Sequence, residues 1–168
     1  AAGGMDHTVA VRADGSLWTW GYNGYGQLGG SQADNVTTPQ RVGTANDWLF
    51  ASAGMASGSV VALRTNGTLW GWGRNISGEL GLGSLSQQST PMQLHAANDW
   101  VHVSGGQFTI ALRANGELWS TGANAGGALG ITGIGNRSEF VQAQGSGWQF
   151  VTTGQAHALG IGPAGALT

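Results

Sequence analysis

Apolar and polar residues alternate over short stretches of this chain, and glycine separates one stretch from the next. Residues 8–12 and 16–20 form the first such pair, rich in β-branched and aromatic residues, with Asp14 and Gly15 between them. Alternation with period two predicts β-strands that bury one face. Because Asp-Gly and Asn-Gly pairs tolerate the two positive φ angles of a type I′ turn, the pattern predicts a tight hairpin.

The same hairpin pattern occurs three times, with about 50 residues between one copy and the next. The sequence Asn-x-x-Gly-x-Leu-Gly follows each hairpin, and a further tryptophan follows later in each unit. A repeat of this length that contains several short strands is typical of one blade of a β-propeller. The repeated positions are Gly15, Gly67 and Gly116 in the turns, Asn23, Asn75 and Asn124 in the loops, and Trp48, Trp100 and Trp148.

We expect four strands in each unit. In the first unit, the third and fourth strands fall at residues 38–42 and 47–51, and Pro39 fits an edge strand, where no N–H is needed for a ladder. No apolar stripe with helical spacing persists over ten residues. The sequence therefore predicts an all-β propeller segment, incomplete as a single chain. Its predicted units are residues 1–51, 52–102, 103–152 and a partial fourth at 153–168, which ends inside a strand.

Composition supports a packed β-protein and excludes several functions. The chain has 32 glycines and eight tryptophans but only three prolines, which favours strands joined by tight turns over disorder. Its six basic residues and net charge of −2 give no basic surface for nucleic acid. Cysteine is absent, and no apolar run reaches the roughly 18 residues that a membrane span requires. We therefore expect no nucleic-acid partner and no membrane insertion, and the low charge favours an extracellular or surface location.

Residues 20–29 and 72–81 share the sequence Trp-Gly-x-Asn-x-x-Gly-x-Leu-Gly, and each follows an Asp/Asn-Gly-x-Leu-Trp turn. These motifs resemble regulator of chromosome condensation repeats, particularly the bacterial type. The resemblance implies a propeller that acts through protein–protein contact. Propellers have roughly four to eight blades, so three units would not close alone. The chain would be part of a longer one, form a ring with further copies, or remain an open arc.

Departures from the family pattern favour packing roles for the repeated positions. Ser59 and Phe108 stand where the family has histidine, and Thr121 replaces a tryptophan. The family's best known member promotes nucleotide exchange on a small GTPase and binds chromatin, but this chain does not match the loops and tails responsible. The sequence Gly24-Tyr-Gly26-Gln-Leu-Gly29 fits a dinucleotide fingerprint formally, yet no helix is expected after it.

No catalytic, cofactor or metal constellation is recognisable. His7 and His157 occupy the same repeat position, so their spacing reflects the architecture, and a packing role is favoured. We therefore expect no enzymatic activity and no cofactor.

Two further sets of charged residues recur with the repeat. The arginines lie beside the hairpin turns, and we expect their stems to pack over strand residues. The aspartates precede the repeat tryptophans and are expected to bond to nearby backbone. The members are Arg12, Arg64 and Arg113, and Asp47 and Asp99.

The loops after the hairpins contain the best candidates for a contact surface. Tyr22 and Tyr25 have no aromatic counterparts in the other units, and Arg74 and Glu79 lie in the second loop. The predicted function is a non-catalytic scaffold for protein–protein interaction, with an unknown protein, further copies of the chain or missing blades as partner. Two alternatives remain, a self-assembling subunit of a surface layer, filament or virion, and a carbohydrate-binding lectin. A GTPase exchange factor ranks last.

Overall fold

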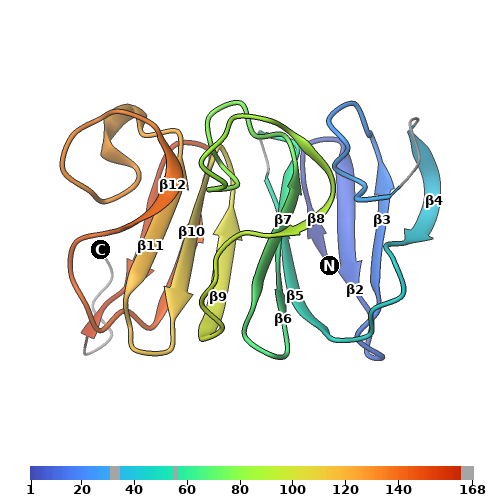
Figure 1. The fold of residues 1–168 in the computed structure, drawn as a ribbon, viewed down its shortest axis with the longest axis horizontal. Coiled ribbons are helices and arrows are strands. Elements are labelled where there is room, and N and C mark those ends of the chain that lie inside the picture. Colours follow the sequence, from blue (N-terminus) through green and yellow to red (C-terminus); the bar gives the residue numbers. More distant parts are fainter. Residues whose placement is uncertain (31–34, 55–56, 164–168) are drawn as a thin grey trace.

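The computed structural model describes residues 1–30, 35–54 and 57–163, which form four antiparallel sheets placed side by side (Figure 1). The first sheet contains β1 (Ala2–Gly3), β2 (His7–Val11), β3 (Leu17–Gly21) and β4 (Val36–Arg41). The second contains β5 (Trp48–Ala53), β6 (Ser59–Arg64), β7 (Leu69–Gly73) and β8 (Gln88–Gln93). The third contains β9 (Trp100–Gly105), β10 (Phe108–Arg113), β11 (Leu118–Gly122) and β12 (Arg137–Gln142), and the fourth β13 (Phe150–Thr153) and β14 (Ala158–Ile161).

The sheets follow one another in chain order and form an open arc, the propeller segment that the repeats predict. Strand β5 contacts both β1 and β9, and β9 contacts β13, so the first strand of each sheet lies on the inner side of the arc. Strands β4, β8 and β12 form the outer side. We call the packing between the first and second sheets the first junction, and that between the second and third sheets the second junction. The predicted strand end at residues 165–168 lies outside the described residues.

The sheets and the sequence units are offset by one strand. Trp48 begins β5, and β5 pairs with β6 along its length, so this strand belongs to the second sheet. The prediction that residues 47–51 complete the first unit's sheet is therefore wrong. The error arises because sequence gives the order of strands, whereas the ladder that a strand joins depends on which edge it meets after the connecting loop.

The hairpin turns differ from the predicted two-residue type. The Gly15 N–H donates to the Arg12 carbonyl at 2.9 Å, and the Arg12 N–H donates to the Ser16 carbonyl at 3.0 Å, which makes a three-residue loop. Gly15 has φ of 74°, the left-handed conformation that follows the turn in such loops. Any Cβ at this position would also collide with the Asn46 carbonyl. Glycine is therefore required by backbone conformation and by the close approach of the next connection.

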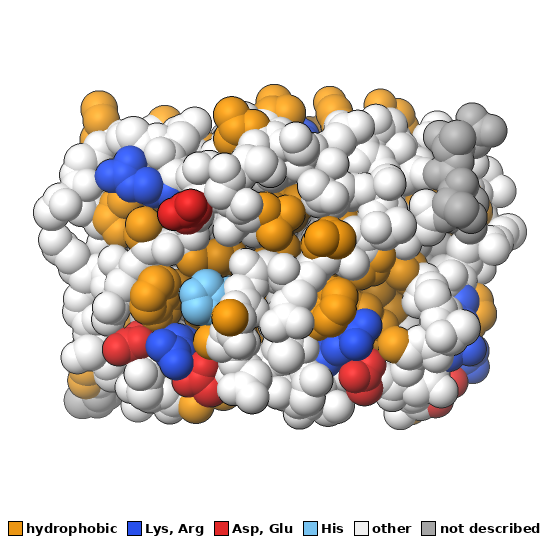
Figure 2. Space-filling view, in the orientation of Figure 1, with side chains coloured by type: hydrophobic (Ala, Val, Ile, Leu, Met, Phe, Trp, Pro, Cys, Tyr) orange, Lys and Arg blue, Asp and Glu red, His pale blue; other side chains and the backbone are white. Residues whose placement is uncertain are grey.

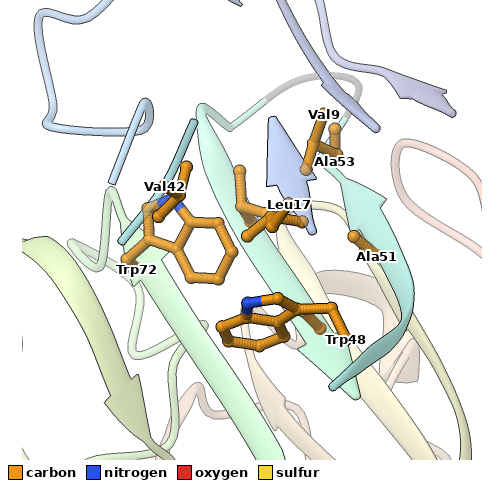
Figure 3. Packing of buried hydrophobic residues seen from close by; sticks show 9 residues of the cluster. Val9, Leu17, Val42, Trp48, Ala51, Ala53 and Trp72 are labelled. Carbon is orange, nitrogen blue, oxygen red and sulfur yellow. The ribbon is translucent and has the colours of Figure 1, made fainter. Parts of the chain in front are cut away.

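Each junction has its own hydrophobic core. Figure 3 shows the first core, where Trp72 from β7 and Trp48 from β5 lie near Leu17 of β3, and Val9 of β2 lies beside Ala53 of β5. Trp72 is fully buried, and its indole N–H donates to the Gln27 carbonyl of the preceding repeat at 2.9 Å. Since each sheet buries its faces against its neighbours, the repeat tryptophans serve mainly to join sheets.

Helical structure is scarce in the part of the chain that the structure describes. It consists of a single 3₁₀ turn at Ala125–Gly127. None of the described residues forms a helix long and apolar enough to cross a bilayer.

Candidate functional site

The loops that follow β3, β7 and β11 share one internal brace. The Asn23 side-chain oxygen accepts the Leu28 N–H at 3.0 Å, and Asn75 accepts the Leu80 N–H at 2.9 Å. Asn124 repeats this bond, and its φ of −125° lies outside the left-handed region, so these asparagines brace the loops through their side chains. All three are buried, so the positions of the loop tips are fixed by the fold.

Two tyrosines project from the first of these loops. Tyr22 and Tyr25 are 41% and 37% exposed, and their rings meet edge to face with centroids 6.2 Å apart. The Tyr25 N–H donates to the Gln27 side-chain oxygen at 2.9 Å, while the Tyr22 N–H donates to the Asp6 carbonyl at 2.7 Å. The backbone under both rings is thus fixed by hydrogen bonds. Fixed, exposed tyrosines lose little side-chain entropy on binding, which suits a contact surface.

Arg74 and Glu79 form an ion pair in the second loop. Arg74 Nη1 lies 3.1 Å from Glu79 Oε1, and the second Glu79 oxygen accepts the Ser77 N–H at 2.7 Å. The Glu79 side chain has no exposed surface, so its predicted role as a contact residue is corrected. The carboxylate instead positions Arg74, whose side chain retains some exposure. Sequence could not separate these roles because both residues are charged loop residues.

Three of the four predicted contact residues line one pocket of about 370 Å³ at the first junction. Tyr22, Tyr25 and Arg74 line it together with Met5, from the turn between β1 and β2, and His7, the first residue of β2. Met5 is 70% exposed. The sequence does not single out Met5, because this residue lies in a different turn, which the folded sheet and the bond between the Tyr22 N–H and the Asp6 carbonyl bring beside the loop.

His7 forms part of the pocket lining and is almost fully buried. Burial lowers its pKa below the ordinary value, and the neighbouring Asp6 carboxylate opposes that effect. The ring is therefore neutral at pH 7, and its Nε2 has no hydrogen-bond partner among the described residues. Within those residues, no three histidine or carboxylate side chains converge to hold a metal ion. The pocket presents the aromatic rings of the two tyrosines, the Met5 thioether and the Arg74 guanidinium, which are groups suited to binding another molecule.

The remaining histidines occupy different environments. His102 packs between Phe50 and Phe150, with ring centroids at 5.4 and 4.7 Å. His95 lies in the second junction, whereas His157, predicted to be equivalent to His7, is exposed. The shared repeat position therefore does not give the two residues the same burial.

The repeat arginines pack on tryptophans, as expected for their stems. The Arg64 guanidinium carbon lies 4.1 Å from the Trp70 ring centroid, and Arg12 lies 5.4 Å from that of Trp18. Asp99 also pairs with Arg113 at 2.9 Å, a partner that the expected bond to nearby backbone did not include. This partner holds the pKa of Asp99 below its ordinary value.

Comparison with known proteins links these features to one repeat family. Residues 14–60 and 66–112 match the family model of the regulator of chromosome condensation (RCC1) repeat. The chain is 34% identical over 104 residues to human "Probable E3 ubiquitin-protein ligase HERC3", covering 60% of this chain and 10% of that protein. It is 30% identical over 96 residues to "Ultraviolet-B receptor UVR8" of Arabidopsis thaliana, covering 57% of this chain and 22% of the receptor. The chain thus spans a small part of these relatives.

Solved structures share the fold at lower sequence identity. Human WBSCR16 superposes with a TM-score of 0.83 at 18% identity, over 98% of this chain and 44% of that one. Prp20p from Saccharomyces cerevisiae, whose study concerns binding to Gsp1p and histones, gives a TM-score of 0.81 at 21% identity, over 94% and 42% of the two chains. The present chain therefore corresponds to less than half of each of these solved chains.

Proposed function

This chain belongs to the regulator of chromosome condensation repeat family, and on that premise we propose that it is a non-catalytic module for protein–protein interaction. The observation that carries the proposal is the pocket that Tyr22, Tyr25 and Arg74 line together. Tyrosine and arginine are the residue types that most often dominate the energy of protein interfaces. We call the surface formed by Met5, Tyr22, Tyr25 and Arg74 the loop surface.

The loop surface is preformed rather than adaptable. Hydrogen bonds fix the backbone beneath the tyrosines, and the buried Glu79 carboxylate holds Arg74 in place. A surface that is already ordered loses less entropy on association, so a small number of anchors can support binding. Hydrophobic side chains also project along the upper edge of the molecule in Figure 2, where the loops after β3 and β7 lie.

The chemistry favoured in a partner is an acidic or neutral polar surface with an apolar centre. The free part of the Arg74 guanidinium can donate to a carboxylate or carbonyl, while the tyrosines offer apolar ring faces and hydroxyl groups. The ligase and photoreceptor activities in the names of relatives are not proposed for this chain. The repeat tryptophans Trp48 and Trp100 lie in the cores between sheets and are not available to stack on sugars, so a lectin site would depend on the exposed loop tyrosines.

The test is site-specific photo-crosslinking followed by affinity measurement. A photoreactive phenylalanine analogue replaces Tyr25, and in a control it replaces Leu49, which is exposed on the inner strand β5. The partner is the protein that crosslinks from position 25 and not from position 49. With that partner purified, the double change Tyr22→Ser and Tyr25→Ser is expected to weaken binding at least about 30-fold, or roughly 2 kcal/mol. Unchanged affinity in a folded double variant would refute the loop surface.

Self-association is a second candidate, and Trp20 favours it. Trp20 shares the repeat position of Trp72, but Trp20 is only half-buried whereas Trp72 is fully buried. A second copy could cover this face of the first sheet. Light scattering over a concentration series would detect the association, and Trp20→Ser should abolish it. A monomer at all concentrations would exclude the candidate without affecting the loop surface.

A further inference from the structure

A second pocket, distinct from the loop surface, lies at the outer side of the first junction. It has a volume of about 370 Å³, and the residues that line it include Val42, Trp48, Trp70, Pro91 and Arg64. Figure 2 shows hydrophobic side chains recessed in the groove between the first and second sheets on this face. We call this cavity the rim pocket.

The second junction shows what fills the corresponding space. The His95 ring lies 5.5 Å from Trp100 at 90°, and 5.8 Å from Trp119. Trp100 and Trp119 occupy the repeat positions of Trp48 and Trp70. His95 is thus an aromatic ring inserted beside the same pair of tryptophans that forms the rim pocket.

The residue equivalent to His95 in the first repeat is Gly43. The Val42 N–H donates to the Leu17 carbonyl just as the Leu94 N–H donates to the Leu69 carbonyl, both at 2.9 Å, so the residues that follow share a position. A Cβ built on Gly43 would meet no atom within 4 Å, although the φ of 62° at this position is one that residues with side chains rarely adopt. The rim pocket therefore lies where a glycine replaces an inserted aromatic side chain.

Electrostatics distinguishes the two sites. Arg113 pairs with Asp99 at 2.9 Å and with Glu117 at 3.3 Å, and its guanidinium carbon remains 5.9 Å from the Trp100 ring. Among the described residues, Arg64 has one carboxylate partner, Asp47, at 3.6 Å.

The guanidinium carbon of Arg64 lies 4.5 Å from the Trp48 ring centroid and 4.1 Å from that of Trp70. This less neutralised cation favours a neutral π-system and disfavours an imidazolium in the rim pocket.

The position of the pocket favours a polypeptide as the source of that ring. Pro91 and Thr90 belong to β8, which ends its sheet and leaves one side of its backbone without a partner strand among the described residues. Exposed strand edges are places where extended segments of other chains add on, with alternate side chains entering adjacent pockets.

We propose that the rim pocket receives an uncharged aromatic side chain, phenylalanine or tyrosine, from a partner protein. The ring takes the place that His95 takes in the second junction, between the repeat tryptophans. The partner thereby supplies to the first junction the ring that His95 supplies to the second.

The first test is a titration of the ¹⁵N-labelled chain with N-acetyl-L-tyrosine amide, observed at assigned tryptophan indole signals. The Trp48 and Trp70 signals are expected to shift with a single saturable binding curve, and N-acetyl-L-alanine amide is expected to cause no shift. Gly43→His should weaken binding of the tyrosine probe at least about tenfold, because it supplies the missing ring from the chain itself. Gln144→His, at the same repeat position of the third repeat, should leave this binding unchanged.

The second test creates the same cavity elsewhere and decides the question even if Gly43→His does not fold. His95→Gly should open a second site, so that the probe now also shifts Trp100 and Trp119 and two molecules bind per chain. Tyr25→Ser should leave the probe titration unchanged, which separates this site from the loop surface. If the probe does not shift the Trp48 and Trp70 signals, or binds the folded Gly43→His variant as tightly as the original chain, the proposal is overturned.

Discussion

The first and second junctions fill equivalent spaces with aromatic side chains, but these side chains come from different strands. At the first junction, Trp72 from the middle strand β7 lies over Gly29 of the preceding repeat. At the second junction, the equivalent residue is the smaller Thr121, and Phe140 from the outer strand β12 lies over Gly81, the counterpart of Gly29. Phe140 in turn corresponds to Pro91.

This difference indicates that the repeat conserves a filled space and not a particular residue. Trp72 contacts Trp48 with ring centroids 6.1 Å apart, and Phe140 contacts Trp100 at 6.0 Å. Each junction therefore places an aromatic ring against its repeat tryptophan. Because protein interiors are closely packed, a loss of volume at one position is tolerated where a neighbour supplies it.

Each junction also keeps a side-chain hydrogen bond to a carbonyl of the preceding repeat, although the donor residue differs. The Trp72 indole donates to the Gln27 carbonyl, whereas the Thr121 hydroxyl lies 2.7 Å from the Gly78 carbonyl and 2.9 Å from that of Arg137. A small polar residue thus keeps a bond to the preceding repeat after the indole is lost.

The largest expected effect comes from removing the ring at the first junction. Trp72→Ala should lower the free energy of unfolding by about 3–5 kcal/mol, because it leaves a cavity and deprives the Gln27 carbonyl of its donor. Thr121→Ala, the matched change at the second junction, should cost only about 1–3 kcal/mol through its lost hydrogen bonds. Urea unfolding at constant pH would measure both. Equal losses of stability in the two variants would contradict the conclusion that Trp72 fills the first junction whereas Phe140, and not Thr121, fills the second.

A smaller effect tests whether one set of residues can replace the other. Trp72→Thr together with Pro91→Phe installs the second junction's residues in the first. The double variant should be more stable than the sum of the single changes predicts, with a coupling energy of about 1–2 kcal/mol. Pro39→Phe, at the equivalent exposed position of β4, provides the control, and it should show no coupling to Trp72→Thr. If the effects of the two single changes on the free energy of unfolding simply add up in the double variant, Phe at position 91 does not compensate for the loss of Trp72.

The smallest expected effect is on the pH dependence of stability, through His102 on the inner strand β9. Burial lowers the pKa of His102 below its ordinary 6.5, although its hydrogen bond to the Val151 carbonyl acts in the opposite direction. The unfolded chain therefore binds a proton more readily, and stability should fall as pH decreases from about 6.5 through the lower pKa of the folded state.

His102→Gln should flatten this dependence between pH 7.5 and 5, measured by thermal unfolding at each pH. The remaining slope comes from other groups, including His7, whose pKa burial also lowers. An unchanged slope in the folded variant would show that His102 contributes nothing to it.

The sequence also predicted a contact surface of four residues, and the structure places three of them in one pocket and buries the fourth, Glu79. The absence of aromatic counterparts in sister repeats singled out Tyr22 and Tyr25, and the fold places them in one pocket with Arg74. Met5 lies on the same surface, but it comes from a different turn. Sequence spacing alone does not show that this turn and the loop are neighbours, because the bond that joins them depends on the completed sheet.

The sequence by itself determined the strands, the repeat period and the family, because alternation, turn glycines and repeated motifs are local or periodic properties of the chain. Only the tertiary structure decided which sheet Trp48 joins, and that Glu79 is buried under Arg74. Only the structure, too, showed that Phe140 replaces Trp72 while Gly43 leaves the rim pocket open. These outcomes depend on volumes and distances between residues far apart in the chain, and such quantities exist only after the sheets have packed.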